Sequence, residues 1–467
     1  MKFKNRYKRL LFLEQFINKY LKKLKKAAPR FELGIKDLQS SALPLGHAAE
    51  ELYNPLEYLN STKSNSLLII SNGHGEDVIA SLIIKELILL RKFNNIEVMP
   101  LVGDGKIFDE LVSQNITKIG FQKVLPSGGF SNQSLKGFWN DFKEGMLIYL
   151  VKNWLELIRK PKDYQILAIG DLLPLFYAWS SQCNFGFIGT PKSDYTWMSG
   201  PGNSISDFYH KLKGSEWDPW EMFIMKSHLC KFVIVRDEIT SRNLNNKKID
   251  AKFLGNPMMD FLQENRLEKN IIDNYMKVIL LIGSRFPEAY YNLNTYLNYL
   301  NDFYFSRKCL ILIPLSANAN LLEIEKQIIK NQFVRNKSSF SIGEQSVWLK
   351  NKMTLLLGKN QFNNWAYLAE VGLANAGTAT EQICGLGIPA LSVPDKGPQF
   401  TRSFAKRQQR LLGGSVSLCE SKDIFHKKLM YLQENKRFRF RQGQIGKERM
   451  GAPGASKRIA KFINLKL

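Results

Sequence analysis

The sequence predicts an α/β protein made of two tandem Rossmann-like, doubly wound domains that face each other across a cleft. Short apolar runs alternate with longer amphipathic stretches, first over residues 66–260 and again over residues 275–450. Glycine-rich turns follow several of the runs. This alternation is typical of parallel strands joined by helices that cover both faces of a sheet.

The length and composition fit that class. A chain of 467 residues is long enough for two domains of about 200 residues each with an extension. Hydrophobic residues make up 44% and charged residues 23%, which excludes wholesale disorder. Five cysteines lie far apart without paired spacing, so we expect neither a disulfide framework nor a cysteine zinc site.

The net charge of +24 is concentrated at the two ends of the chain. Residues 1–30 hold 11 Lys/Arg and one acid, and residues 401–467 hold 17 Lys/Arg and 4 acids. Basic ends suit an anionic membrane surface or nucleic acid. Aromatic side chains spaced for base stacking are limited there to Phe438 and Phe440, so nucleic acid is not expected.

Residues 1–65 form a basic N-terminal extension with two open interpretations. From Leu10 to Leu24 apolar residues recur at helical spacing among lysines, as in a helix that lies on an anionic membrane. Residues 30–50 instead resemble a translated transfer-RNA gene, which would mean that the start is placed too far upstream. Disorder or a misassigned start therefore stands beside the membrane helix. No segment is expected to span a membrane.

The first unit begins at a buried strand. Its expected strands are Leu67–Ile70, Ile96–Leu101, Gln165–Ile169, Phe185–Ile188 and Phe232–Val235. Helices are expected over Asp77–Leu90 and Lys106–Gln114. Each strand is a short apolar run, the pattern of a strand buried on both faces.

The alternation of expected strands and helices is interrupted near Gly255-Asn256-Pro257 and then resumes. The strands expected in the second unit are Val278–Ile282, Leu310–Pro314, Thr354–Leu357, Val371–Ala374 and Ala390–Val393. The helices expected there are Pro287–Leu300, Leu321–Lys330, Asn363–Glu370, Thr378–Leu386 and Gln399–Leu411. A last helix is expected over residues 451–467.

Three side chains of the first unit are candidates for acid–base chemistry. His74 and Asp77 lie in a glycine-rich turn directly after the first strand, and Asp171 directly follows the strand that ends at Ile169. Ligands of doubly wound sheets bind beyond the carboxyl ends of strands, so these groups would project into the cleft. The simpler interpretation is that both aspartates cap helices and that His74 is a turn residue.

The second unit has two turns suited to a diphosphate. Gly283, Ser284 and Arg285 end one strand and offer close backbone approach with a guanidinium fork. Gly377 opens a helix whose first amides suit a diphosphate, with hydroxyls from Thr378 and Thr380.

Three further side chains are candidates for the sugar end of a nucleotide sugar. Glu381 or Gln382 would contact a ribose, and Gln399 a sugar. The sequence has no Asp-x-Asp pair, so neither a metal nor another cofactor is expected.

These motifs resemble the glycosyltransferases of the GT-B architecture, in particular lipid-A-disaccharide synthase and its synthase-related proteins of photosynthetic bacteria. The more distant resemblance is to the peptidoglycan N-acetylglucosaminyltransferase. The stretch Leu281–Glu288 is similar to the synthase motif Pro-Gly-Ser-Arg-x-x-Glu, with Ile282 in place of its proline. Arg236–Glu238, Gly255–Pro257 and Arg449–Ser456 also match the family, the last as the start of a helix that returns to the first domain.

The sequence departs from the family at the ribose and acceptor positions. Counting back from Pro389, the family's ribose-binding glutamate falls on Gln382, with Glu381 one place early. Asp171 matches the catalytic aspartate, but the second aspartate of that motif is missing. The residues at the predicted acceptor site therefore match the family less well than those at the predicted nucleotide-sugar site.

The resemblance implies an inverting, metal-independent transferase that moves a hexosamine from a UDP-sugar to a lipid or lipid-linked acceptor. It would act in the cytoplasm, peripherally attached to the inner face of a membrane. Residues 66–260 would bind the acceptor and residues 275–450 the nucleotide sugar. A nucleotide-sugar 2-epimerase of the same fold, or a non-catalytic membrane-binding protein, is the alternative.

A lipid acceptor would require the first domain to touch a bilayer. Aromatic residues and lysines alternate after residue 191, namely Lys192, Trp197 with Met198, Lys211, Lys213, Trp217 and Trp220. Such a mixture suits the headgroup region of a membrane. Alternatively, these tryptophans cover the sheet, since Trp is usually largely buried.

Overall fold

The computed structural model describes residues 65–467 except 113–115, 123–145, 200–204, 263–271 and 395–399. The expected N-terminal helix and Gln399 therefore lie outside the described residues. In the described ranges no helix is long and apolar enough to cross a bilayer.

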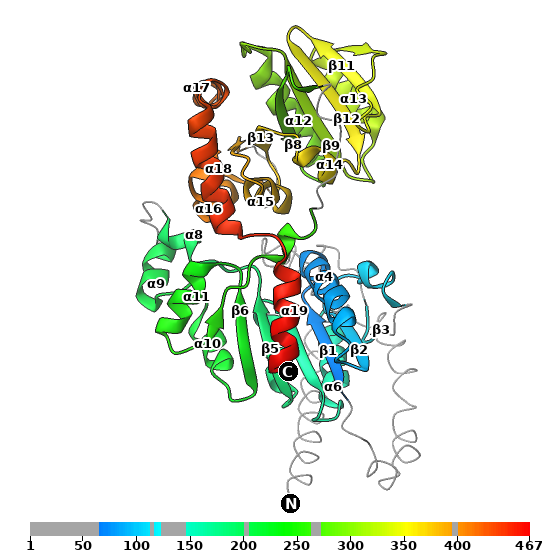
Figure 1. Cartoon of the computed structure of the whole chain (residues 1–467), viewed down its shortest axis with the longest axis vertical. Coiled ribbons are helices and arrows are strands. Elements are labelled where there is room, and N and C mark those ends of the chain that lie inside the picture. Colours follow the sequence, from blue (N-terminus) through cyan, green and yellow to red (C-terminus); the bar gives the residue numbers. More distant parts are fainter. Residues whose placement is uncertain (1–64, 113–115, 123–145, 200–204, 263–271, 395–399) are drawn as a thin grey trace, which may run out of the picture. The chain divides into compact units, whose positions relative to one another are not determined.

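The first sheet is parallel throughout, in the order β3-β2-β1-β4-β5-β6-β7 (Figure 1). Its strands are β1 (Ser66–Ser71), β2 (Asn95–Pro100), β3 (Ile116–Lys118), β4 (Gln165–Gly170), β5 (Asn184–Gly189), β6 (Cys230–Val235) and β7 (Ala251–Lys252). Its helices are α4 (His74–Leu90), α6 (Met146–Ile158), α7 (Leu172–Ser180), α8 (Tyr195–Met198), α9 (Ile205–Lys213), α10 (Pro219–Met225) and α11 (Glu238–Asn246), with the 3₁₀ turns η3 (Lys106–Phe108) and η6 (Pro257–Met259).

The second sheet has the order β10-β11-β12-β9-β8-β13-β14-β15, and only the β10–β11–β12 edge is antiparallel. Its strands are β8 (Met276–Leu281), β9 (Cys309–Leu315), β10 (Val334–Asn336), β11 (Ser346–Lys350), β12 (Met353–Lys359), β13 (Val371–Ala374), β14 (Ala390–Ser392) and β15 (Val416–Leu418). The helices are α12 (Glu288–Asn301), α13 (Leu321–Lys330), α14 (Phe362–Ala366), α15 (Thr378–Gly385), α16 (Arg402–Leu412), α17 (Lys422–Glu434), α18 (Lys436–Met450) and α19 (Ala455–Lys466), with the 3₁₀ turn η8 (Gly413–Ser415).

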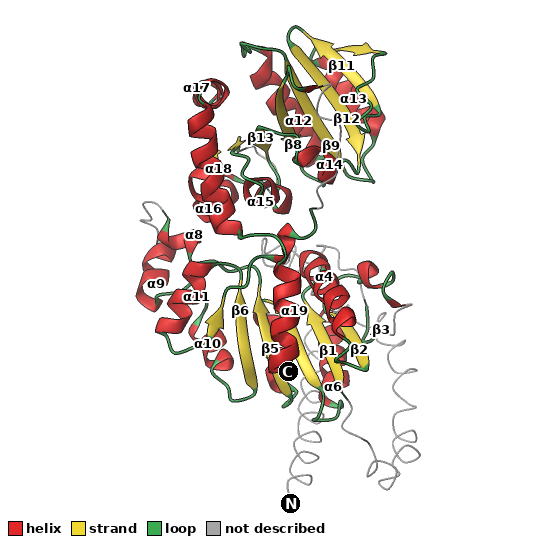
Figure 2. Cartoon of the chain, viewed as in Figure 1, coloured by secondary structure: helices red, strands yellow, loops and turns green. Residues whose placement is uncertain are grey.

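The central strands are uninterrupted apolar runs because both faces of each sheet are covered (Figure 2). In β1, Leu68 and Ile70 join a core that includes residues of α6 and α7, while Leu67 and Ile69 join a second core that includes residues of α4 and α19. All four side chains are fully buried. The predicted class of two doubly wound α/β units is confirmed.

The helix expected over Lys106–Gln114 was wrong in its extent. Among the described residues of this range only η3 and Val112 are helical, both in 3₁₀ geometry, and Phe108 and Leu111 are buried in the core beneath α4. Their spacing therefore reflects the packing of a short turn.

The last helix packs on the first sheet. Ile459 and Ile463 of α19 belong to the core that contains α4, and the Phe462 and Phe232 rings lie 5.3 Å apart, centroid to centroid, edge to face. The Asp260 carboxylate caps the start of α19, accepting hydrogen bonds from the backbone amides of Gly454 and Ser456 at 2.5 and 2.6 Å. A carboxylate at a helix N-terminus is favourable because it satisfies free amides.

Candidate active site

The strand order reverses at one place in each sheet, between β1 and β4 in the first and between β8 and β13 in the second. Crossovers run outward in opposite directions from such a point, which leaves a crevice at the carboxyl ends of the two strands. Most of the candidate residues lie at these two places.

At the second switch point the two glycine turns meet. Gly283 follows β8 with φ +91, and a Cβ there would lie 3.3 Å from the Asn375 carbonyl oxygen after β13. Only glycine adopts this backbone without strain at such close approach. Ser284 is exposed beside it, and burial lowers the pKa of the half-buried Arg285 while Glu288 opposes that shift.

The α15 N-terminus opens onto the same edge. Gly377 precedes the helix without a side-chain cap, and both it and Thr378 are exposed. From α16, the Gln408 amide donates to the carbonyl oxygens of Ala376 and Gly377 at 2.9 and 3.1 Å, which fixes the turn. Uncapped first-turn amides with a positive helix-dipole end favour an anion.

A buried amide network holds these turns in place. The Asn375 side chain donates to the Asn292 side chain at 3.0 Å and to the Val393 carbonyl at 2.6 Å. It accepts hydrogen bonds from the Tyr296 hydroxyl at 2.7 Å and from the Val393 amide at 3.1 Å. All four hydrogen-bonding positions of the amide are occupied, so the carboxyl ends of β8, β13 and β14 are tied together.

The other donor-side candidates do not all face this edge. Thr380 is fully buried and donates to the Ala376 carbonyl at 2.7 Å, and Gln382 is buried and donates to the Met258 carbonyl at 2.9 Å. Glu381 forms an ion pair with Arg236 of the first domain at 2.8 Å. Thus Gly283, Ser284, Arg285, Gly377 and Thr378 gather at the edge, whereas Thr380 and Gln382 point into the protein.

At the first switch point α4 begins immediately after Gly73. This glycine has φ +105, and a Cβ would lie 2.7 Å from the Val102 carbonyl oxygen, so a side chain cannot be accommodated. Helix α4 starts at His74, whose side chain lies outside what is described. Asp77 is buried and accepts the Ser71 hydroxyl at 2.5 Å, and Asp171 caps α7 by accepting the Leu173 amide at 3.1 Å.

Glu76 was not predicted to be a functional residue from the sequence. Its carboxylate accepts the Thr190 hydroxyl at 2.9 Å over the ends of β4 and β5. Burial raises the pKa of Glu76, helped by the charges of Asp171 and Asp77, while the Thr190 hydrogen bond opposes the shift. The motif contained this residue, but only the fold places it beside Thr190.

Arg236 connects the carboxyl edge of the first sheet to α15 of the second domain. Arg236, after β6, donates to the Thr190 carbonyl at 3.4 Å and to Glu381 at 2.8 Å. The Glu76–Thr190 pair and the first turn of α15 are therefore separated by a single guanidinium.

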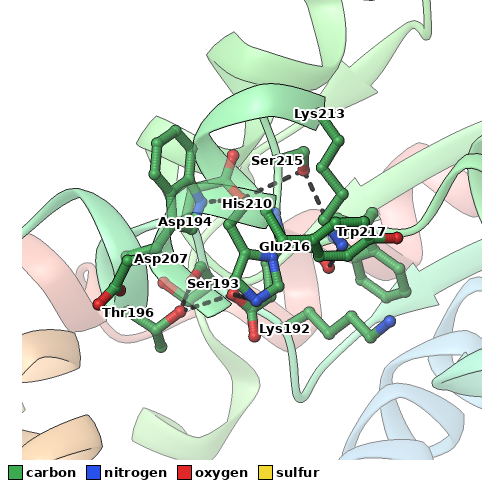
Figure 3. A network of polar contacts seen from close by, with 12 residues as sticks. Lys192, Ser193, Asp194, Thr196, Asp207, His210, Lys213, Ser215, Glu216 and Trp217 are labelled. Atoms are coloured by element: carbon green, nitrogen blue, oxygen red, sulfur yellow. Dashed lines mark hydrogen bonds and ion pairs between the residues drawn. The ribbon is translucent and has the colours of Figure 1, made fainter. Parts of the chain in front are cut away.

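A polar network anchors the loop between α9 and α10 to α8 and α11 (Figure 3). The fully buried Asp194 accepts hydrogen bonds from the Glu216 amide at 2.5 Å, the Ser215 hydroxyl at 3.1 Å, the Trp197 indole at 3.2 Å and the Asn243 amide at 2.7 Å. Burial raises the pKa of Asp194 to about 6 against these donors.

Asp194→Ala should lower the free energy of unfolding by about 3 kcal/mol, because several buried donors lose their acceptor. Asp194→Asn keeps the shape and one acceptor oxygen, so it should cost only about 1 kcal/mol. Urea denaturation measures both. The control is Asp250→Ala, which removes a mostly exposed carboxylate paired with Lys252. Equal stability of Asp194→Ala and the control would contradict the role given to the network.

A polar cavity of about 1180 Å³ lies against this network and is lined by α8, α9 and α16. Ion pairs join its walls, from Arg407 to Glu216 at 2.9 Å and from Arg410 to Asp207 at 2.6 Å. Gln408, between these two arginines on α16, braces the Gly377 turn. Helix α16 therefore borders both the cavity and the Gly377 turn.

The tryptophans expected at a membrane separate into two groups. Trp217 is fully buried against Phe187, so that part of the expectation was wrong: the indole covers the sheet. Trp220 and Met198 are exposed. Helix α9 adds apolar residues that the sequence reading overlooked, with Ile205, Phe208 and Leu212 exposed by 91%, 70% and 76%.

No protein-family model matches the chain, and no curated protein matches its sequence. Its fold is similar to that of solved structures. A UDP-GlcNAc 2-epimerase from Neisseria meningitidis bound to UDP-GlcNAc aligns with TM-score 0.50 and 16% identity, over 85% of this chain and 99% of that one. The S. aureus MnaA–UDP co-structure aligns with TM-score 0.51 and 13% identity, over 85% and 95%. These likenesses establish the two-domain GT-B architecture.

Proposed function

We propose that this protein is a nucleotide-sugar enzyme that binds a UDP-sugar at the carboxyl edge of β8 and β13. One observation carries the proposal. The two glycine turns selected for a diphosphate meet at the switch point of the second sheet, and the acid–base candidates lie at the switch point of the first. Two solved structures of similar fold contain UDP or UDP-GlcNAc, which supports the same ligand class here.

The donor would be held mainly by backbone. Gly283 and Gly377 allow the diphosphate to approach the main chain, while Arg285 and the hydroxyls of Ser284 and Thr378 supply donors. Glu381 would contact the ribose, since Gln382 is turned into the protein, and Gln399 would contact the sugar. When the bond to the sugar breaks, the α15 N-terminus would stabilise charge on the departing diphosphate.

Transfer to a lipid or lipid-linked acceptor is the reaction we favour, and the surface of α9 supports it. One face of this helix exposes Ile205, Phe208 and Leu212, while Ser206 and His210 on its other face line the polar cavity. An amphiphilic acceptor could place its headgroup in the cavity with its chains in a membrane. An exposed apolar face of this kind is typical of a surface that contacts a membrane or another protein.

A nucleotide-sugar 2-epimerase is the second candidate, and the structural neighbours favour it. Several of the similar structures are UDP-GlcNAc 2-epimerases. Epimerisation would need the donor site and an acid–base pair but no acceptor.

The assay that separates the two uses UDP-GlcNAc with and without a bacterial lipid extract. Transfer predicts release of UDP and a glycosylated lipid only when extract is present, with undiminished activity in EDTA. Epimerisation predicts UDP-ManNAc without extract. Absence of both products in the full-length protein would overturn the proposal.

The apolar face of α9 should bind membranes. Phe208→Ser with Leu212→Ser should weaken sedimentation of the full-length protein with anionic vesicles by about tenfold, since two apolar side chains lose a buried environment. Leu322→Ser on α13 is the control, because Leu322 is 71% exposed in the second domain. Equal binding of the variant and the control would remove α9 from the membrane surface.

A further inference from the structure

We propose that Glu76 is the proton acceptor of the reaction, in place of Asp77, Asp171 or His74. The inference rests on the proposed function. It follows from how the three carboxylates at the first switch point are engaged.

Asp77 and Asp171 both have structural roles. Asp77 is only 4% exposed and accepts the Ser71 hydroxyl at 2.5 Å within the first turn of α4. Asp171 uses one oxygen to cap α7. Each carboxylate therefore holds the start of its helix, which is a structural role.

Glu76 is placed differently. It lies over the carboxyl ends of β4 and β5, close enough that a Cβ on Gly170 would be 3.6 Å from its Cγ. The Thr190 hydroxyl at 2.9 Å orients the carboxylate at the edge where ligands of doubly wound sheets bind. Contacts through Thr190 and Arg236 link it to Glu381 in the first turn of α15.

The charged groups around Glu76 are compatible with its role as a general base. Asp77 on the same helix and Asp171 after β4 repel its ionised form, whereas Arg236 after β6 attracts it. Burial is the larger effect and raises its pKa, which strengthens it as a base near neutral pH.

The step balances without a metal or redox partner. The Glu76 carboxylate takes the proton of the acceptor hydroxyl, and the oxygen attacks the anomeric carbon. The bond from that carbon to the diphosphate breaks, and its electron pair leaves with UDP. The proton on Glu76 is then released to water.

Glu76→Gln should lower kcat by about 10²–10⁴-fold, the usual contribution of a general base, with UDP affinity within about twofold of wild type. The wild-type rate should rise with pH through the raised pKa of Glu76, and this acid limb should vanish in the variant. Glu86→Gln, a carboxylate near the far end of α4, is the matched control and should behave as wild type.

Thermal stability tests the raised pKa of Glu76 independently of turnover. A carboxyl group whose pKa is higher in the folded than in the unfolded state stabilises the fold at low pH. This stabilisation is lost as the pH rises through the folded-state pKa. Glu76→Gln should therefore melt about 2–4 °C above wild type at pH 8, with the gap closing towards pH 4.

The outcomes distinguish failure of the Glu76 assignment from failure of the proposed function. A variant that melts below wild type at pH 8, keeps its turnover or loses UDP affinity would overturn the assignment of Glu76. Wild-type protein that binds no UDP would instead overturn the proposed function, and this inference with it.

Discussion

Asn375→Leu should lower the free energy of unfolding by about 3 kcal/mol and weaken UDP binding at least about tenfold. Leucine fills nearly the same volume but leaves the buried partners at Asn292, Tyr296 and Val393 without their hydrogen bonds. The Gly377 turn follows two residues later, so loosening Asn375 should misplace the diphosphate amides.

Urea denaturation and calorimetry with UDP measure the two effects. Ser392→Ala is the matched control, because it removes a single hydrogen bond, to the Ala374 carbonyl at 2.8 Å, and should cost only about 1 kcal/mol. Asn375→Leu with the stability of that control would show that the network does not hold the turn.

Arg285→Ala should weaken UDP binding by about 2–3 kcal/mol, or roughly 30- to 150-fold, if the guanidinium makes a charge-assisted hydrogen bond to the diphosphate. Stability should change little, because the side chain is half-exposed at the end of its strand. Calorimetry with UDP measures the loss.

Arg307→Ala is the control for charge. Arg307 precedes β9 at the opposite, amino end of the sheet and pairs with Glu370 at 2.8 Å. Both variants remove one positive charge from the same domain. Equal UDP affinity in the two would exclude Arg285 from the site.

The strands were predictable where burial is complete. Leu67–Ile70 and Leu310–Pro314 lie in central strands, and an apolar run is required when both faces are covered. The β10 edge strand carries no such signal because Val334 and Arg335 are exposed.

The candidate site was predictable in its turns and not in its side-chain directions. Gly283 and Gly377 mark strand ends, which a sequence reveals directly. Whether Thr380 and Gln382 face the crevice depends on which side of α15 packs on the protein, and that side is set by Met258 and other distant residues. A one-residue step on a helix turns a side chain by about 100°.

Long-range contacts account for what the sequence reading missed. Thr190 lies 114 residues from Glu76, and Arg236 lies 145 residues from Glu381. Neither pairing follows from any local pattern. Each exists because parallel strands bring their carboxyl ends to one edge.

A crystal structure of the full-length protein with UDP tests the central claim most directly. The account predicts the diphosphate against the amides of Gly377 and Thr378, with Arg285 in hydrogen-bonding reach and Gly283 beside it. UDP bound away from the β8–β13 edge, or no bound UDP at saturating concentration, would contradict it.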